Sequence, residues 1–555
     1  MVQRPLNPLF IRSIRNLSLS ASNSHLVSLF LLACFWVMPV NGATPTGAQP
    51  VKESVDQSVE MRVDLSRHIR KLPATLLGFN IHYLYFQDDL TNGYGVARPD
   101  VIDALSNLPG VMYRYPGGLV ANQFDWRAAS GPQRLRGDQR AAKWVKPQPV
   151  RFGPDEYLNF VRSVGGAPWY VLNLRGWDST GENWQGIELP LETMVASNVA
   201  LAKKMRAALG PDATLFFELG NELDRADYEW SHAKYIARSR ANIDAIRAQD
   251  PNTRFVAFLR DFPWRYRDQE RQGQVSNPQK FIQEVLRALP EVNDISLHYY
   301  YDDPGMEDRK TKWIPWRLNL FNTALATAQA ERAPGELKLW VTEHARGVNL
   351  TQPKPMKRIR LTSNLQGAIS SSDFLIHLAG IPAVQGAALH GLNAGPWQVF
   401  DHGSLADDGT PRPTYEALRL LAQSRLPTLV HSSATGPNNS GYGGGYDINV
   451  AAMVGDGSAV GDAEHLNLWV VNRANRDYDS NLVVPHLAGR KAIMRLRSLH
   501  APKDDSLTGD TVLAPNLVRA DGGEQTVVFD SKGCLSVPLP PLSVNTISLQ
   551  LVSTD

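Results

Sequence analysis

Two glutamates directly follow runs of apolar residues, an unusual position for a charged side chain. Glu222 lies in the polar second half of FFELGNELD (residues 216–224), at the exit of its apolar first half, and Glu343 lies near the end of WVTEH (residues 340–344). If both runs are buried strands, their carboxyl groups can face each other across a small pocket. Such a pair carries out glycoside hydrolysis, with one carboxyl group protonated to assist the leaving oxygen and the other ionised to attack the anomeric carbon. We therefore predict that Glu222 and Glu343 are catalytic.

Polar side chains end several other apolar runs and are candidates for the same pocket. Arg114, His298 and Tyr300 are placed to keep Glu343 ionised, because opposite charge and hydrogen bonding favour the ionised form of a carboxyl group. Asn221 directly precedes the other glutamate and is placed to bond a sugar hydroxyl. The remaining predicted substrate-binding residues are Asn80, His82 and Trp397.

Other polar and aromatic residues have plainer interpretations. Asp224 is interpreted as a loop or helix-cap residue, and His390, within an apolar run, as a core histidine. The position of His344 is open between the pocket wall and a supporting place behind it. Three tryptophans in long loops are candidates for outer sugar subsites, namely Trp144, Trp177 and Trp184.

The elements that must position these residues alternate along the chain from residue 72 to about residue 425. Eight short apolar runs are predicted strands: 76–82, 111–115, 169–174, 214–219, 254–259, 294–300, 337–342 and 382–390. Helix-forming stretches lie between them, including 191–208, 231–249, 278–288 and 361–378. Eight βα units predict a (β/α)₈ TIM barrel over residues 72–425, with the active site at the C-terminal ends of the strands.

The pattern changes beyond residue 426. Helical runs end, and short alternating strands such as LNLWVVNR, QTVVFD and SVNTISLQLV follow one another between turn residues. This pattern predicts an antiparallel β-sandwich over residues 426–555. The strand-like stretch at 59–71 precedes the barrel and is predicted to join that sandwich, after a polar linker at 44–58.

Residues 1–43 have the composition of a secretory signal peptide. Arg4, Arg12 and Arg15 precede an apolar run at 26–40, and small residues follow at 41–43. The run is shorter than the roughly 20 residues that a membrane span needs. We expect a secreted or periplasmic protein, with an uncleaved membrane anchor or a lipoprotein at Cys34 as open alternatives.

Composition and motifs argue against several other functions. A net charge of +2 is not that of a nucleic-acid-binding protein. The only cysteines are Cys34 and Cys534, so no cysteine-based metal or redox site is available. The sequence has no His-Glu-x-x-His run, G-x-S-x-G elbow or Walker loop, and we expect neither a metal nor a cofactor. Nothing in the sequence indicates the oligomeric state.

Taken together, the motifs resemble those of clan A glycoside hydrolases. They are YRYPGG with FDW (residues 113–126), LGNE (219–222), SLHYY (296–300) and WVTEH (340–344), and the resemblance extends from about residue 77 to residue 395. The branches that the sequence most resembles are the α-L-arabinofuranosidases and the heparanase/β-glucuronidase group. The closing LPPLSVNTISL (539–549) also resembles the last strands of their accessory sandwich.

The resemblance implies roles for the matching residues. It makes Glu222 the acid/base and Glu343 the nucleophile of a retaining double displacement, with Arg114, His298 and Tyr300 near the nucleophile. The expected substrate is an oligo- or polysaccharide.

Two departures leave the sugar open. LGFNIHY (77–83) lacks the strand 1 glutamate of the arabinofuranosidases, and Leu119 stands where they carry Asn and the uronidases carry Thr or Ser. A β-glucuronidase/heparanase-like hydrolase and a non-catalytic carbohydrate-binding protein are the alternatives.

Overall fold

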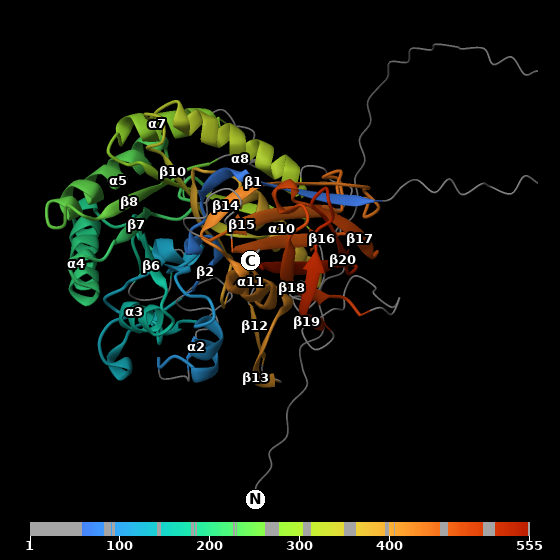
Figure 1. Cartoon of the computed structure of the whole chain (residues 1–555). Helices are drawn as coiled ribbons and strands as arrows, with labels where there is room; N and C mark the ends of the chain where they lie inside the picture. Colours follow the sequence, from blue (N-terminus) through green and yellow to red (C-terminus); the bar gives the residue numbers. More distant parts are fainter. Residues whose placement is uncertain are drawn as a thin grey trace, which may run out of the picture. The chain divides into compact units, whose positions relative to one another are not determined.

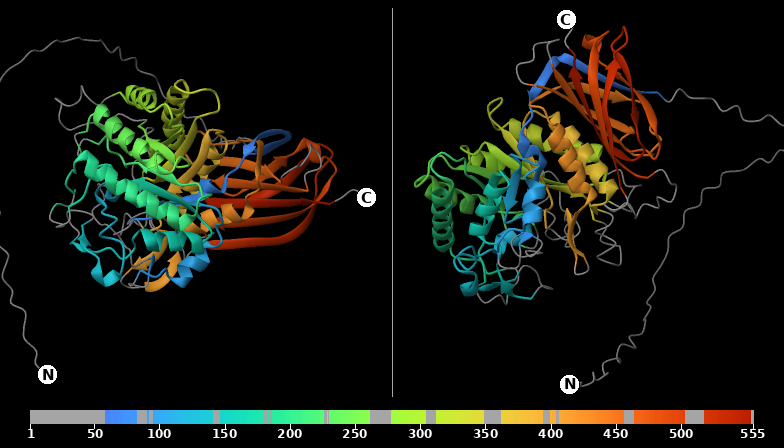
Figure 2. Two further views of the ribbon diagram at one scale, coloured as in Figure 1. Left: turned by 90° about the vertical axis from the view of Figure 1, so that its left-hand side faces the viewer. Right: turned by 60° about the horizontal axis from the view of Figure 1, so that its bottom comes forward.

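The computed structural model describes residues 58–552 of the chain, with gaps (Figures 1 and 2). The segments outside the described residues are 1–57, 83–89, 92–94, 141–145, 179–182, 184–185, 226–227, 229, 261–276, 304–311, 349–361, 394–398, 404–405, 456–463, 503–516 and 553–555. The predicted signal peptide, nearly all of the predicted linker and the candidates Trp144, Trp184 and Trp397 therefore lie outside the described residues. Among the residues described, no helix combines the length and the apolar character needed to cross a membrane.

Eight parallel strands close into a barrel, which confirms the predicted (β/α)₈ fold (Figure 1). Each strand pairs with the next barrel strand along the chain, and the last pairs with the first. The strands are β2 (Gly78–Asn80), β3 (Met112–Tyr115), β6 (Ala167–Leu172), β7 (Phe216–Leu219), β8 (Arg254–Phe258), β9 (Asp294–Tyr301), β10 (Lys338–Arg346) and β11 (Val384–Leu389). The first strand is shorter than predicted, because Ala74–Leu77 forms a 3-10 turn before it.

Helices follow the barrel strands and pack their apolar faces against the outside of the barrel. They are α2 (Pro99–Leu105), α3 (Pro154–Ser163), α4 (Leu191–Leu209), α5 (His232–Arg247), α7 (Pro278–Ala288), α8 (Ile314–Gln329), α10 (Leu365–Ala379) and α11 (Pro413–Ser424). The helix predicted from residue 361 begins at Leu365, where the Asn364 side chain accepts a hydrogen bond from the Gly367 backbone N–H. Such a cap satisfies a backbone donor that the first helical turn leaves free.

Side chains that point into the barrel form an apolar layer with a polar layer above it. The apolar layer consists of Met112, Trp169, Phe216, Val256, Trp340 and Ala388. Polar residues lie two positions further along three of these strands, on the same face, and β9 adds a fourth. They are Arg114 and Glu218, with Ser296 and Thr342 on β9 and β10. The apolar layer thus supports a polar one toward the C-terminal ends of the strands, where sites in this fold lie.

Strand β10 departs from regular alternation. Its pairing with β9 shifts register between Val341 and Glu343, which is a β-bulge. Thr342 donates a hydrogen bond to Glu218, and the next residue, Glu343, accepts one from Arg114. The bulge therefore turns two consecutive side chains of β10 toward the barrel interior.

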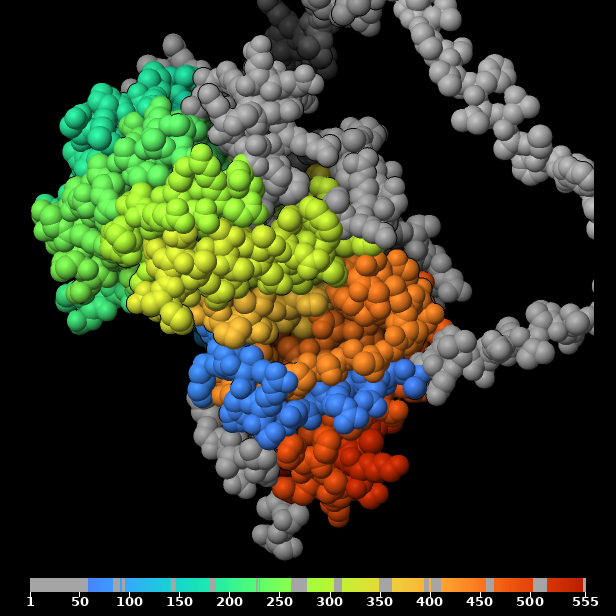
Figure 3. Space-filling view, turned by 90° about the horizontal axis from the view of Figure 1, so that it is seen from above, coloured from blue at the N-terminus to red at the C-terminus, as the bar shows by residue number. Residues whose placement is uncertain are grey.

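Four short strands form two-stranded sheets, β4 (Asp138–Gln139) with β5 (Gln148–Pro149) and β12 (Phe400–Gly403) with β13 (Ala406–Pro411). Nine others form a sheet beyond the barrel, in agreement with the predicted second region. In sheet order they are β19 (Val518–Val528), β18 (Lys491–His500), β21 (Ser543–Leu551), β16 (His465–Asn472), β15 (Ile448–Val454), β14 (Thr428–Thr435), β1 (Val59–Lys71), β17 (Tyr478–Val483) and β20 (Cys534–Leu539). β1 runs antiparallel to β14 and parallel to β17, so the sheet is not antiparallel throughout. Because β1 comes from before the barrel, no hairpin sets its direction. Figure 3 shows β1 in blue beside the orange strands.

The two faces of this sheet bury different partners. On one face, residues such as Val450 and Val470 join a core made by the sheet itself. On the other face, residues such as Met453 and Trp469 join the core of the barrel. Trp469 also donates a hydrogen bond of 3.0 Å to the Leu421 carbonyl of α11. The sheet is thus packed on the barrel through a continuous apolar contact.

A buried ion-pair group, which we call the interface cluster, lies where the sheet meets α10. Arg473, which follows β16, donates 2.7 Å hydrogen bonds to both Asp373 of α10 and Asp302, which follows β9. Its guanidinium lies 3.6 Å from the centre of the Tyr442 ring, and Tyr446 donates to Asp373 at 2.9 Å. These five residues join the sheet to the barrel.

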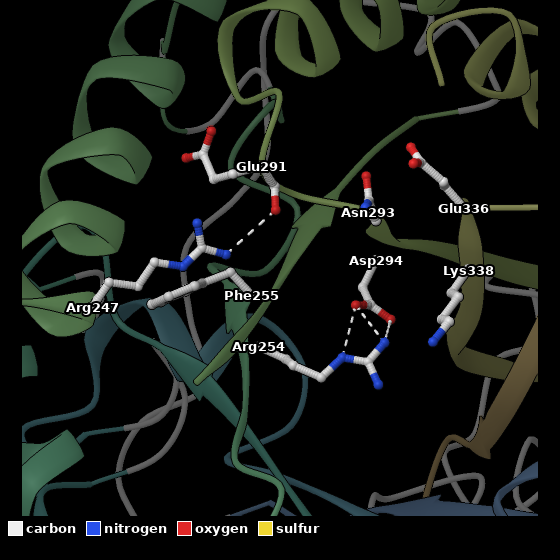
Figure 4. A pocket seen from close by; sticks show the side chains of 8 residues that line it. All are labelled: Arg247, Arg254, Phe255, Glu291, Asn293, Asp294, Glu336 and Lys338. Atoms are coloured by element: carbon white, nitrogen blue, oxygen red, sulfur yellow. Dashed lines mark hydrogen bonds and ion pairs between the residues drawn. The ribbon is translucent and has the colours of Figure 1, made fainter. Parts of the chain in front are cut away.

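A pocket of about 250 Å³ lies at the other end of the barrel, near the N-terminal ends of β8, β9 and β10 (Figure 4). Arg254 and Asp294 form a bidentate ion pair within it, and Asp294 also accepts a hydrogen bond from Trp340. Arg247 donates to the Glu291 carbonyl. Charges that neutralise each other at this end of a barrel are typical of stability rather than catalysis.

Candidate active site

The strand-end residues predicted from the sequence lie together at the C-terminal end of the barrel. β7 leads to Glu222, β10 carries Glu343, and β9 carries His298 and Tyr300. One ligand-type atom from each of Glu222, His298 and Glu343 lies within 4.8 Å of the others. Arg114 of β3 lies below them and is fully buried. Residues distant in the sequence thus form one compact group.

Glu343 is buried and surrounded by groups that stabilise its charge. Oε1 accepts a hydrogen bond from Arg114 at 2.9 Å, and Oε2 accepts one from the Tyr300 hydroxyl at 2.8 Å. His298 and His390 lie 3.6 Å and 3.5 Å from Oε2. Burial alone would raise the pKa of Glu343, but these neighbours together hold the pKa well below its ordinary value. Glu343 is therefore a carboxylate.

Glu222 lies on a turn with unusual backbone geometry. Its φ angle is 47°, a left-handed conformation that costs a non-glycine residue about 1–3 kcal/mol. The turn is braced by Asn122, whose side-chain amide accepts from the Asn221 backbone N–H at 3.0 Å and donates to the Asn221 carbonyl at 2.5 Å. The surrounding protein thus holds Glu222 in a direction that a relaxed strand would not give it.

His298 connects the two glutamates. Its Nδ1 lies 3.0 Å from Glu222 Oε1, and its Nε2 lies 3.1 Å from the Thr342 hydroxyl. Burial works against a charge on His298, but Glu343 and Glu222 together raise its pKa. Burial also favours the protonated form of Glu222, yet the hydrogen bond and charge of His298 lower the pKa of Glu222 overall. Both shifts favour His298 as the holder of the proton that lies between it and Glu222.

Asn221 presents an amide nitrogen to the site. Its Oδ1 accepts a hydrogen bond from Arg114 at 2.7 Å, which fixes the orientation of the side chain. Its Nδ2 is buried and has no hydrogen-bond partner among the described residues. A buried donor without a partner costs about 1–3 kcal/mol, so the position favours a ligand that supplies an acceptor.

Asn80 is placed as a support for Arg114. Its Oδ1 accepts from Arg114 at 2.8 Å, and its Nδ2 donates to the Thr342 carbonyl at 2.7 Å. Both ends of the fully buried side chain are thus bonded within the protein.

Glu218 completes this network, and our sequence analysis did not single it out. It is fully buried and accepts hydrogen bonds from Arg114, Trp169, Ser296 and Thr342. The signal that could have identified it is strand alternation, because Glu218 lies two residues before Gly220 and two after an inward-facing phenylalanine. A buried carboxylate needs such partners, since an unpaired buried charge is strongly unfavourable.

His82 and His390 lie next to each other at the site. Their rings are 5.1 Å apart in an edge-to-face arrangement, and the His82 backbone is held in both directions by the Asn393 side chain. His390, interpreted from the sequence as a core histidine, instead lies beside Glu343. Burial lowers the pKa of both rings, that of His82 to about 3, so both are neutral.

Three other residues lie outside this group. Asp224 forms a buried ion pair with Arg260 rather than a helix cap. His344 packs behind the site, where its Nδ1 lies 3.0 Å from the Tyr301 hydroxyl and its ring lies against Phe374. Trp177 is partly buried in the loop after β6.

Within the part of the chain that is described, one group of residues has the composition and spacing of a metal site, and it is Glu222, His298 and Glu343. The same three groups are those that acid–base and nucleophilic chemistry on a sugar requires. The expectation of no metal stays a prediction.

Comparisons with known proteins agree with this geometry. A family model described as the alpha-L-arabinofuranosidase 1 domain matches residues 104–317, a range that includes Arg114, Glu222, His298 and Tyr300. The family 51 alpha-L-arabinofuranosidase from Thermotoga petrophila RKU-1 has the same fold, with a TM-score of 0.65, 16% identity, and coverage of 88% of this chain and 100% of that one. These similarities support the resemblance to clan A glycoside hydrolases that the motifs predicted.

Curated relatives place it near the arabinofuranosidases. It is 28% identical over 130 residues to a probable alpha-L-arabinofuranosidase C from Aspergillus clavatus, over 22% of this chain and 26% of the relative. It is 27% identical over 217 residues to an intracellular exo-alpha-(1->5)-L-arabinofuranosidase from Streptomyces lividans, over 37% of this chain and 30% of the relative. The matched part therefore spans less than a third of either relative.

Proposed function

We propose that the protein is a retaining glycosidase, with Glu222 as acid/base and Glu343 as nucleophile, and that its substrates are α-L-arabinofuranosides. The observation that carries this proposal is the closeness of the two carboxyl groups, which have oxygens within 4.8 Å of each other. Retaining enzymes have carboxyl groups about 5–5.5 Å apart, whereas inverting ones need roughly 6.5–9.5 Å to admit a water molecule. The spacing favours direct attack by a carboxylate.

In the first step, a Glu343 oxygen attacks the anomeric carbon and the bond to the leaving oxygen breaks. Glu222 gives its proton to that oxygen, so an alcohol leaves and a glycosyl ester of Glu343 remains. The ionised state of Glu343, held by Arg114 and Tyr300, supplies the electron pair. The proton reaches Glu222 along its 3.0 Å hydrogen bond with His298.

In the second step, water attacks the anomeric carbon of the ester. Glu222, now a carboxylate, accepts a proton from that water, and the bond from the sugar to Glu343 breaks. The product keeps the configuration of the substrate, and both glutamates return to their starting states. Asn221 Nδ2 is the donor that we assign to a sugar hydroxyl beside the acid.

The arabinofuranoside assignment is supported by the family match and the curated relatives. Two positions favour testing other sugars as well. The barrel interior has Asn80 rather than an acid at the end of β2, and Leu119 lies partly exposed after the Gly117–Gly118 pair. A glucuronide substrate is therefore the second candidate.

Covalent labelling tests the proposal. We expect a cyclitol epoxide or aziridine of α-L-arabinofuranose configuration to label the protein at Glu343, and the gluco- and glucurono-configured probes to label it far more slowly. Mass spectrometry of the labelled peptide locates the bond. Glu343→Gln is the matched control and should not be labelled. Labelling by the glucurono-configured probe alone would transfer the assignment to the second candidate, and binding of sugars without any labelling would indicate a non-catalytic protein.

We also propose that residues 1–43 direct export and are removed. Arginines followed by an apolar run and small residues support this. Expression of the full chain in a bacterium should give periplasmic or secreted protein that begins near residue 44, which N-terminal sequencing detects. Retention of the intact segment in the membrane fraction would support the anchor instead.

A further inference from the structure

Glu218 is the centre of the buried polar layer below the two glutamates. Its Oε2 accepts from Arg114 at 2.5 Å and from the Trp169 indole at 3.1 Å. Its Oε1 accepts from the hydroxyls of Ser296 at 2.7 Å and Thr342 at 2.8 Å. A carboxylate paired with a guanidinium accepts hydrogen bonds and donates none. Every neighbour must therefore point its hydrogen at Glu218.

This requirement fixes the hydrogen of Thr342. A hydroxyl has one hydrogen to donate, and that of Thr342 is used by Glu218. Thr342 can then only accept a hydrogen bond from its other close neighbour, His298 Nε2, at 3.1 Å. His298 must consequently carry a hydrogen on Nε2, which leaves Nδ1 facing Glu222 Oε1.

We propose that Glu218, acting through Thr342, is a positioning residue that holds His298 in its Nε2–H form and so makes His298 and Glu222 share one proton. This proposal rests on the proposed function of Glu222 as acid/base. When His298 is neutral in this form, its Nδ1 is an acceptor, so the hydrogen bond between the two residues exists only if Glu222 is protonated. The arrangement therefore favours the protonated form of Glu222, which an acid catalyst needs.

Loss of the Thr342 contact should lower the pKa at which the pair His298 and Glu222 releases its shared proton. With His298 held as Nε2–H, removal of the shared proton brings the Nδ1 lone pair against a carboxylate, which is unfavourable. If His298 were free to become Nδ1–H, the deprotonated pair would keep a hydrogen bond to Glu222. The shared proton would then leave at lower pH. The Thr342 contact therefore extends the pH range of activity to higher pH.

Other groups also face His298 and set the background against which Thr342 acts. Glu343 lies 3.6 Å from Nδ1, and Arg114, below it, opposes protonation of the imidazole. The Phe258 ring of β8 lies 5.0 Å away, and burial lowers the pKa of His390, which follows β11. None of these contacts touches Nε2, so Thr342 alone among the described neighbours selects the tautomer.

The structure offers a matched pair of variants. Thr342→Val and Ser296→Ala each remove one hydroxyl from the same oxygen of Glu218, and both residues are fully buried. Only Thr342 touches His298. We expect Thr342→Val to lower the basic limb of the kcat/KM profile by about one pH unit, the effect of one hydrogen bond on a proton equilibrium. Ser296→Ala should leave the basic limb where it is in the wild type. Thr342→Ser, which keeps a hydroxyl, should have its basic limb at the wild-type pH.

The tautomer itself is measured without catalysis. In protein labelled with ¹⁵N-histidine, the His298 signals, assigned with His298→Gln, should show a protonated Nε2 in the wild type above neutral pH. Thr342→Val should show a mixture or the Nδ1–H form. An Nδ1–H wild type, or equal shifts of the pH limb in Ser296→Ala and Thr342→Val, would overturn the proposal. Absence of activity on every sugar would overturn the proposed function and leave the tautomer result standing.

Glu218→Gln is the direct but harsher variant. Its amide nitrogen cannot accept from Thr342 or Arg114, and a misfolded protein would be uninformative about His298. The two hydroxyl variants avoid this difficulty because they keep the Arg114–Glu218 ion pair.

Discussion

Two buried arginines, each between two carboxylates, have opposite relations to the chemistry. Arg114 bridges Glu218 and Glu343 inside the barrel, and one of these partners is the predicted nucleophile. Arg473 bridges Asp302 and Asp373 in the interface cluster, and both partners are bonded only to protein groups. The charge arrangement is similar, but the barrel group also holds Asn221 and lies beside the pair of carboxyl groups of Glu222 and Glu343.

The difference teaches what a buried ion pair indicates. Removing charges from water is costly in both places, and a bridge of this kind is weak evidence for net stabilisation. At the interface cluster, the bridge fixes how the sheet packs on α10. In the barrel, the same bridge sets the ionisation of Glu343. Burial and pairing alone therefore do not identify a catalytic group.

The largest expected effect is on the nucleophile. Glu343→Ala should lower kcat on an aryl α-L-arabinofuranoside by about 10⁴-fold or more, because no glycosyl ester can form. Thermal unfolding should change little compared with this loss. Steady-state kinetics and circular dichroism measure the two quantities. An active Glu343→Ala variant would remove the distinction between the two regions.

The second effect depends on the leaving group. Glu222→Ala should lower kcat/KM by about 10²–10⁴-fold on substrates with poor leaving groups, because the leaving oxygen is no longer protonated. The loss should be much smaller for a dinitrophenyl glycoside, which leaves without a proton. A series of aryl leaving groups gives the slope, and equal losses across the series would contradict the acid role.

The third effect compares the arginines directly. Arg473→Met should reduce the free energy of unfolding by about 3–5 kcal/mol, because it leaves two carboxylates buried near each other. It should change kcat/KM less than about threefold in the protein that remains folded. Arg114→Met should reduce both quantities. Urea denaturation and kinetics at low temperature test the pair, and selective loss of activity in Arg473→Met would connect the interface cluster to the site.

The smallest effect concerns His344, which lies between the two regions against Phe374 of α10. Burial and the nearby His390 lower its pKa to about 3, so it stays neutral in the folded protein. The unfolded chain binds a proton below about pH 6.5, and stability therefore falls as the pH drops from there toward 3. His344→Gln should flatten this dependence by about 1.4 kcal/mol per pH unit. Urea denaturation at pH 7, 6 and 5 measures the slope, and an unchanged slope would show that His344 is charged when folded.

The sequence was sufficient for the barrel because each strand is a compact apolar run followed by helix-forming residues. It also brought Glu222, Glu343, Arg114, His298 and Tyr300 to one end, since parallel strands place their C-terminal ends together. Supporting contacts were harder to predict. The bonding of Asn80 to Arg114 and of His390 to the site depends on which face of a strand each side chain takes.

Contacts between residues far apart in the sequence were also not predicted. Nothing near Asn122 in the sequence indicates that it braces the Asn221 backbone, and nothing near Arg473 indicates its two aspartates. Such pairs form only when distant segments pack. The inward direction of Glu218 could have been predicted from strand alternation, because Phe216 and Glu218 lie on one face of β7.

The bulge in β10 changes which residues of the strand face the barrel interior. Before it, Trp340 and Thr342 face inward, and after it the inward register passes to Glu343. If β10 paired with β9 in regular alternation and had no bulge, Thr342 would still face inward, but Glu343 would face the surrounding helices. The predicted nucleophile thus depends on the backbone bulge, which directs its side chain inward, as much as on being a glutamate.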